Sequence, residues 1–272
     1  MCKVLKVSRS SYYKYLNKKP SKRELENEII CNKIIDIHKA SKNRYGAPKI
    51  NESLKAEGIN ISLKRTQRLM KKLGIKSITI KKYRPTSSKR KIEEQENVLK
   101  RDFQANTINE KWVTDITYIH TVKDGWCYLA SVMDLYSRKI IGYAMSRSID
   151  TSLALRAVKN AIELQKPTKP LILHSDLGCQ YTSNAFKEYI AATKIITHSF
   201  SSKGCPYDNA CIESFHASLK KEEVHIVKYF DYDTARLAIF EYIESWYNRK
   251  RIHSSIGYIT PQKCEDLAKN SA

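Results

Sequence analysis

Three acidic residues stand where the surrounding pattern favours apolar or neutral side chains. Asp115 lies inside a β-branched, aromatic-rich run, Asp176 directly follows the apolar string PLILHS, and Glu213 lies in the helical string NACIESFHASLK. A carboxylate within a core strand is costly unless it is paired or binds a metal ion. Three converging carboxylates form an oxygen site suited to Mg²⁺ or Mn²⁺, and two such ions can promote phosphodiester displacement. Without further context, ordinary capping or surface carboxylates are the preferred interpretation.

The elements that must position these carboxylates follow an α/β pattern. Three strands with a turn at Lys123-Asp124-Gly125 precede alternating helices and strands, which predicts a mixed sheet with flanking helices. Asp176 then follows a strand end, where sites gather in open α/β sheets. The expected strands are 112–122, 126–137, 139–146, 170–174 and 194–198, and the expected helices are 151–165, 183–193, 209–220 and 234–248.

The first third of the chain has a helical pattern. Ser21 begins a capping box, and helices are expected over about 21–40, 48–58 and 62–74. The first would bury an apolar face, and the third would turn basic residues outward. A short turn between the last two helices suits a helix-turn-helix, and the alternative is an ordinary helical bundle with a solvated basic face. The proposed inward residues are Leu25, Ile29, Ile34, Ile37, Leu69, Met70 and Leu73, and the proposed DNA contacts are Lys64, Arg65 and Arg68.

Charge is distributed unevenly along the 272 residues. The net charge is +21, of which residues 1–102 carry +18 (28 Lys and Arg against 10 Asp and Glu). Residues 103–272 carry +3 (21 against 18). This excess favours a polyanionic partner, most often nucleic acid, and argues against a collagen, a coiled-coil rod or an acidic tail. Residues 77–105 have the composition of a basic linker, which either lies on DNA phosphates or is simply solvated.

Cysteine usage and hydropathy indicate the compartment. The seven cysteines are odd in number and include no CxxC pair, which disfavours a disulfide framework and a structural zinc site. The chain has no apolar run long enough for a membrane span and no signal-peptide core at its start. We therefore expect a cytoplasmic protein with free thiols and no membrane partner.

Four strings together resemble one known family. WVTDITYI, HSDLGCQYTS, KGCPYDNACIESFHASLK and WYNRKRIHSSIGYITP occur in the order seen in OrfB-type transposases of the insertion-sequence-three family, within the DDE transposase and retroviral-integrase superfamily. The resemblance runs from about residue 4 to 265. It implies a ribonuclease-H-like catalytic core with a C-terminal helical extension over 106–265, after a helix-turn-helix-like region over 1–76.

The resemblance also implies roles for particular residues. Asp115, Asp176 and Glu213 would hold two divalent ions, Mg²⁺ or Mn²⁺, and act as the catalytic triad. The 36 residues between Asp176 and Glu213 slightly exceed the usual family spacing. Lys220 lies two helical turns after Glu213 on the same face as His216, so it either holds a DNA phosphate or is a surface lysine. Arg249 and Arg251 either contact DNA, as the resemblance implies, or complement a helix C-terminus.

Other polar residues near these strings have simpler interpretations. His174 shares a strand face with Asp176, and a packed or supporting role is preferred to metal ligation. Asp134 is expected to end a strand and cap a turn through Ser137. Asp208 is expected to cap the helix that carries Glu213. The segment 199–210 is either a mobile loop that orders on DNA or a passive connector.

The function that follows is DNA transposition by metal-dependent cleavage and strand transfer. Double-stranded transposon ends and target DNA would be the partners, bound by a homo-oligomer. The alternatives are a non-catalytic DNA-binding regulator derived from a transposase and a structure-selective nuclease on the same core. Because the chain starts like a second reading frame of this family, we expect full activity to need fusion to, or partnership with, an upstream-frame product.

Overall fold

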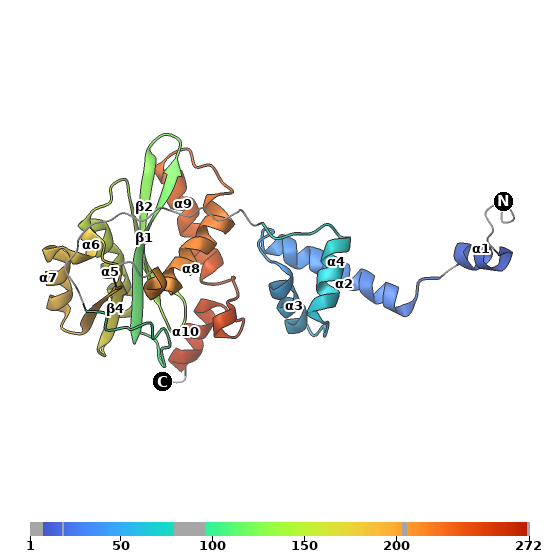
Figure 1. The fold of residues 1–272 in the computed structure, drawn as a ribbon, viewed down its shortest axis with the longest axis horizontal. Coiled ribbons are helices and arrows are strands. Elements are labelled where there is room, and N and C mark those ends of the chain that lie inside the picture. The colour runs from blue at the N-terminus through green and yellow to red at the C-terminus, as the bar shows by residue number, and fades with distance from the viewer. Residues whose placement is uncertain (1–7, 18, 79–95, 203–205, 271–272) are drawn as a thin grey trace. The chain divides into compact units, whose positions relative to one another are not determined.

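The computed structural model describes residues 8–17, 19–78, 96–202 and 206–270. The chain divides into two compact units, Met1–Ile78 and Thr79–Ala272 (Figure 1). Each unit has its own buried core and is described by itself.

The first unit is all-helical. Ser21 forms both bonds of the expected capping box, since its hydroxyl accepts from the N–H of Glu24 and the Glu24 carboxylate accepts from the N–H of Ser21. A first helix that the sequence did not predict precedes it and buries none of its residues. The helices are α1 (Arg9–Leu16), α2 (Lys22–Ala40), α3 (Ala47–Ala56) and α4 (Leu63–Lys72).

The buried face of α2 differs from the expected one. Leu25 and Ile29 are exposed, while Ile30, Ile34 and His38 are buried. No residue of α2 before Ile30 is buried, and the first half of the helix contacts α4 through polar groups, where Arg65 donates to Glu26 and Asn27. The apolar residues of the first half had suggested a face that the helix does not use, because nothing in the described part of the unit covers it.

A buried asparagine joins α3 to α4. The Asn51 side chain donates to the carbonyl of Ile61 at 2.9 Å and to the Thr66 hydroxyl at 2.9 Å. Gly58 ends the preceding turn with a φ of +83°, in the region that favours glycine. These bonds fix the short connection and the angle of α4, which is the arrangement expected of a helix-turn-helix.

The second unit is built on one five-stranded sheet with the order β3-β2-β1-β4-β5. The first three strands are antiparallel, and β4 and β5 join parallel to β1, as the sequence predicts. The strand predicted over 126–137 ends at Asp134, because the chain turns there. The strands are β1 (Lys111–Thr121), β2 (Gly125–Asp134), β3 (Ile140–Ser146), β4 (Leu171–Ser175) and β5 (Ile196–Phe200).

Helices cover both faces of this sheet (Figure 1). On one face, α5 (Thr151–Gln165), α6 (Cys179–Thr182) and α7 (Asn184–Thr193) enclose a core around the fully buried Trp112. Gly142 on β3 lets α5 approach closely, since a Cβ there would collide with the carbonyl oxygen of Ala157. The other face carries α8 (Ala210–Leu219), α9 (Tyr232–Glu241) and α10 (Pro261–Asn270).

Two predicted long helices contain wider turns. After α8, the π-helical segment Lys220–Val224 is closed by a bond from the N–H of His225 to the carbonyl of Lys220. After α9, the π-helical segment Tyr242–Tyr247 follows. Apolar periodicity cannot distinguish these turns from a continuous α-helix, and it gave no sign of α10. No described helix is long and apolar enough to cross a membrane.

The last residues of the predicted linker pack on the sheet unit. Leu99 is buried, and its N–H donates to the Ser199 hydroxyl at 2.9 Å. The N–H of Phe200 donates to the carbonyl of Glu96 at 3.0 Å. The basic part of the linker, 79–95, lies outside the described residues.

Candidate active site

The register of two parallel strands brings Asp115 and Asp176 together. Val113 on β1 pairs with His174 on β4, which is the last pair before the strands diverge. Each aspartate lies two residues beyond this pair, so both extend from the same side of adjacent strands. Asp176 is held further by the N–H of Gly178, which donates to its Oδ1 at 3.0 Å.

The third carboxylate reaches the same place from α8. Glu213 lies in the first turn of this helix, and His216 follows one turn later. The buried His216 ring places Nδ1 3.4 Å from Asp115 Oδ2 and Nε2 3.0 Å from the Ser131 hydroxyl. This contact fixes α8 against β1 and β2 and turns the Glu213 helix toward Asp115. We call Asp115, Asp176 and Glu213 the acidic edge.

Electrostatics indicate that the three charges act on one another. Burial raises the pKa of Asp176 to about 6, and the charges of Asp115 and Glu213 contribute. Desolvation of its carboxyl group, then the charge of Asp115, raises the pKa of Glu213, although the residue as a whole is exposed. Among the described residues, no lysine or arginine forms an ion pair with any of the three. The acidic edge therefore carries negative charge that a cation would relieve.

The donor chemistry of the edge fits a hard divalent cation. All three side chains offer oxygen, and Asn209 adds a buried Oδ1 that has no hydrogen-bond partner, while its Nδ2 donates to the carbonyl of Thr114 at 3.1 Å. Within the described ranges, no three histidine, cysteine or acidic side chains already surround one point. A metal ion would thus have to draw the carboxylates closer.

Lys220 begins the π-helical turn after α8 and lies beside the edge. Its ammonium group is 4.0 Å from the centre of the Tyr118 ring on β1. Burial lowers the pKa of Lys220, and the charge of Asp115 opposes that shift. The spacing from Glu213 had placed Lys220 on this face, and it is a half-buried cation next to the acidic edge.

A second acidic group, Glu222, lies two residues after Lys220, and its charge is compensated. Glu222 accepts from Arg251 Nη2 at 2.9 Å, from the Tyr242 hydroxyl at 3.0 Å and from Trp246 Nε1 at 3.1 Å. Arg251 also donates to the Ser218 hydroxyl at 3.2 Å. Only 11% of each charged side chain is exposed. We call these residues the Glu222 cluster, and it ties the C-terminal segment to the helix that carries Glu213.

The basic residues proposed to contact DNA therefore differ in availability. Arg251 has its partner inside the protein, and Arg65 makes a two-pronged contact with Glu26, at 2.9 Å and 3.1 Å. Apart from Lys220, the remaining three, Lys64, Arg68 and Arg249, are exposed and form no ion pair within the described parts of the chain. Sequence spacing could not distinguish these two groups, because the acidic partners lie far away in the sequence.

Two of the simpler interpretations are confirmed. His174 is fully buried, and its two ring nitrogens lie 2.9 Å and 3.1 Å from the hydroxyls of Ser199 and Ser201. Burial lowers its pKa to about 4. Asp134 accepts from the N–H and the hydroxyl of Ser137, both at 2.8 Å.

The interpretation of Asp208 as a helix cap is wrong. Asn209 occupies the cap position of α8, and Asp208 lies in the preceding 3₁₀ turn. Its buried carboxylate accepts from the N–H of Ser202 at 2.8 Å and pairs with Arg101, so it holds the chain before β1 rather than the helix. Burial favours the neutral acid, but these donors lower the pKa of Asp208 overall. Part of the predicted loop 199–210, residues 203–205, lies outside the described residues.

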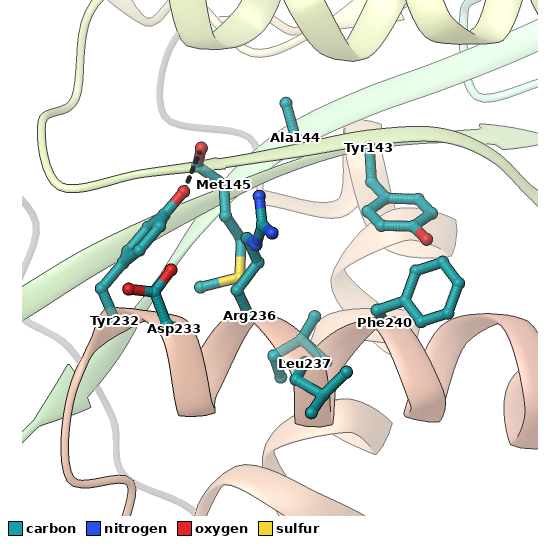
Figure 2. A pocket seen from close by; sticks show the side chains of 9 residues that line it. Tyr143, Ala144, Met145, Tyr232, Asp233, Arg236, Leu237 and Phe240 are labelled. Atoms are coloured by element: carbon teal, nitrogen blue, oxygen red, sulfur yellow. Dashed lines mark hydrogen bonds between the residues drawn. The ribbon is translucent and has the colours of Figure 1, made fainter.

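A groove lies elsewhere on the sheet unit. Its volume is about 650 Å³. Figure 2 shows its lining from β3, which contributes Tyr143 and Met145, and from α9, which contributes Tyr232 and Phe240. The Tyr232 hydroxyl donates to the carbonyl of Met145 at 2.9 Å. The lining is mostly apolar, and none of the acidic-edge carboxylates belongs to it. The groove therefore adds nothing to the chemistry of the edge.

A ribonuclease-H-like sheet with an acidic edge, joined in one chain to a helix-turn-helix-like unit, defines the class of integrase-core proteins. Comparison with protein-family models agrees. Two models described as "Integrase core domain" match residues 105–206 and 194–261, and one described as "HTH-like domain" matches 24–83. The chain belongs to the family of InsF transposases of insertion sequence IS3.

The family assignment rests on similarity to curated relatives. The transposase InsF for insertion sequence IS3A of Escherichia coli (strain K12) is 36% identical over 269 residues, covering 98% of this chain and 93% of the relative. A 31 kDa protein of insertion element IS600 from Shigella sonnei is 36% identical over 262 residues, covering 96% of each.

Solved structures show more distant likeness. The catalytic core of HTLV-2 integrase in complex with magnesium is 17% identical with a TM-score of 0.44, covering 60% of this chain and 99% of that chain. The simian T-cell lymphotropic virus intasome in complex with a PP2A subunit is 14% identical with a TM-score of 0.47, covering 85% and 74%.

Proposed function

We propose that this transposase cleaves phosphodiester bonds at the ends of its insertion sequence and joins the released ends to target DNA. The observation that carries the proposal is the acidic edge, where burial and like charge raise the pKa values of Asp176 and Glu213, and where no lysine or arginine of the described residues forms an ion pair with the three carboxylates. Asp115, Asp176 and Glu213 would hold divalent ions, Mg²⁺ or Mn²⁺, and two ions suit an in-line displacement. When bound, such ions activate the attacking oxygen and stabilise the leaving oxygen.

The chain's own residues position this chemistry. His216 and Ser131 orient Asp115, and the N–H of Gly178 orients the Asp176 carboxylate. Lys220 binds a DNA phosphate next to the acidic edge. Its ammonium group is close enough to Asp115 for the two charges to interact, so it can hold a phosphate beside the carboxylates. The Glu222 cluster holds the C-terminal segment to α8, the helix that carries Glu213.

DNA is held by a separate basic surface. Residues 1–78 carry 20 Lys and Arg against 6 Asp and Glu, a net charge of +14. Lys64 and Arg68 on α4 contact the transposon end, and Arg249 contacts DNA from the sheet unit. The transposase acts as a homo-oligomer that brings two ends together, and an upstream-frame product supplies a further part of the active assembly.

A strand-cleavage and joining assay tests the proposal. Labelled insertion-sequence ends are incubated with Mg²⁺ or Mn²⁺ and this chain, alone and fused to the upstream frame. Products that depend on metal and disappear in Glu213→Gln are expected. DNA binding without cleavage in every form, unchanged by Glu213→Gln, would show a regulator instead. Cleavage without joining would show a nuclease.

A further inference from the structure

The exposed face of the β1–β2 hairpin carries a row of aromatic rings. Tyr118 and Trp126 pack edge to face with ring centres 5.2 Å apart, and His120 lies 5.0 Å from Trp126 in the same arrangement. Tyr118 and His120 alternate along β1, and Trp126 pairs with His120 across the hairpin. The three rings therefore form one surface, which we call the hairpin row.

The hairpin row is not needed to form the core. Ile119 and Cys127, on the opposite face of the same hairpin, are fully buried and make the contacts that hold it to its unit. By contrast, 43% of Tyr118 and 53% of Trp126 are exposed. The other two tryptophans of the chain, Trp112 and Trp246, are buried. A cross-strand aromatic pair stabilises a hairpin by only about 0.2–1 kcal/mol, which does not account for leaving so much ring surface in water.

The row lies near the acidic edge along β1. Tyr118 lies three residues beyond Asp115, a separation of about 10 Å along the strand, and its side chain leaves the opposite face of β1 from that of Asp115. The Lys220 ammonium group lies 4.0 Å from the Tyr118 ring centre, so the first ring of the row is covered by a cation next to the edge. The far end of the hairpin carries another cation, Lys123, which is exposed. Aromatic rings with cations on both sides are complementary to a nucleic acid strand, whose phosphates bind the cations and whose exposed bases stack on the rings.

We propose that the hairpin row stacks against unpaired bases of a DNA strand end held at the acidic edge. This rests on the proposed function, which places a phosphodiester next to Lys220. Bases inside a duplex hide their faces, so only unpaired bases can stack on Trp126 and Tyr118. Stacking on an aromatic side chain is worth about 1–3 kcal/mol per base and tolerates any base, so the row would hold an opened end of any sequence.

Tryptophan emission of the full chain is the first readout. Because Trp126 is the exposed tryptophan, a base that stacks on it quenches emission while the buried indoles report little. We expect quenching by a duplex with an unpaired 3′ tail and by a single strand, and little quenching by a blunt duplex. Trp126→Phe should remove the response. An equal response in Trp126→Phe would overturn the proposal.

Binding affinity is the second readout. Trp126→Ala should weaken binding to the tailed duplex by about tenfold, as measured by fluorescence anisotropy, and leave blunt-duplex binding unchanged. Phe240→Ala is the matched control, since Phe240 is similarly exposed (52%) but lies on α9. Equal affinities of Trp126→Ala and wild type for both DNAs would overturn the proposal. The proposal would also be overturned if Trp126→Ala changed the sedimentation coefficient of the protein and left its DNA affinity unchanged. That result would show that Trp126 contacts another protein chain instead.

The two proposals fail separately. Metal-dependent cleavage by the wild-type chain is measured in the same preparation. Cleavage without selective quenching would leave the proposed function intact and remove the role of the hairpin row. Quenching specific to tailed DNA without cleavage would support base stacking and remove the catalytic role of the acidic edge.

Discussion

The acidic edge and the Glu222 cluster share one helical segment, but their carboxylates differ in whether a basic group neutralises them. Glu213 and Glu222 lie nine residues apart. Glu222 is surrounded by a guanidinium, a phenol and an indole N–H, all within 3.1 Å. The acidic edge has like charges as neighbours, and the pKa of Asp176 rises to about 6 as a result of burial and of these charges.

This difference shows which charges belong to the fold and which await a ligand. A buried charge that is fully paired inside the protein adds specificity but attracts nothing further. Carboxylates whose pKa values are raised by burial and like charge, as those of Asp176 and Glu213 are, store an unfavourable energy, which a cation relieves on binding. The same contrast separates Arg65, paired with Glu26, from the exposed Lys64 on the same helix.

The largest expected effect comes from the acidic edge itself. Asp176→Asn and Glu213→Gln should each reduce strand transfer by about 10³-fold or more, because each removes a metal-binding oxygen charge. In the absence of metal, neither variant should lower the free energy of unfolding, because each also removes repulsion between the carboxylates of the acidic edge. Product formation on a gel and a urea titration measure both quantities. Activity within about tenfold of wild type would contradict the role of the edge.

The Glu222 cluster should show the opposite behaviour. Arg251→Ala leaves Glu222 buried without its counter-charge and should cost about 3–5 kcal/mol in the free energy of unfolding. The double variant Arg251→Ala with Glu222→Ala should lose less than the sum of the two single variants. If Arg251→Ala kept wild-type stability and lost only DNA affinity, Arg251 would be a DNA contact instead.

The pH dependence of stability distinguishes the two regions again. The pKa of Asp176 is about 6 when folded and about 3.9 when unfolded. The native state therefore binds more protons between these values, and stability falls as the pH rises from about 4 to 6, by at most about 3 kcal/mol. Metal-free unfolding of wild type and Asp176→Asn, compared at both ends of this window, measures the difference. A wild-type slope retained in Asp176→Asn would assign the titration to other groups.

A smaller change at the same edge tests geometry without changing charge. An alanine Cβ at position 178 would lie 2.9 Å from Asp176 Oδ1, so Gly178→Ala should turn that carboxylate and reduce strand transfer by about tenfold. Gly46→Ala is the control, since its Cβ would meet only ordinary contacts of 3.5 Å or more. Equal activity of both variants would show that Asp176 adjusts freely.

The smallest effect concerns the exposed cations of α4. Lys64→Ala with Arg68→Ala should weaken binding to all DNA sequences and reduce the salt dependence of log Kd by about two. Arg65→Ala should instead destabilise the first unit, because it leaves Glu26 and Asn27 without their partner. Anisotropy titrations at several salt concentrations check this. An unchanged salt slope in the double variant would exclude these two phosphate contacts.

Local patterns predict the parts of this molecule that depend on neighbours in the sequence. The capping box at Ser21, the strand carrying Asp115 and the turn at Asp134 are examples. The grouping of the three acidic-edge carboxylates follows from motif resemblance, because each of them lies within a string typical of the family. The partners of Arg251, Arg65 and Asp208 cannot be predicted in this way, because each contact joins residues 29 or more positions apart. The π-helical turn at Lys220–Val224 also escapes prediction, since an apolar pattern has no distinct signal for it.

Metal-dependent stabilisation tests most directly whether the acidic edge awaits a cation. The unfolding midpoint of the full chain is measured with and without saturating Mg²⁺ or Mn²⁺, for wild type, Asp176→Asn and Glu222→Gln. Binding to the native state alone raises the midpoint. We predict a rise for wild type, a rise of similar size for Glu222→Gln from its lower starting point, and none for Asp176→Asn. An equal rise in Asp176→Asn would show that the cation binds elsewhere and would contradict the account.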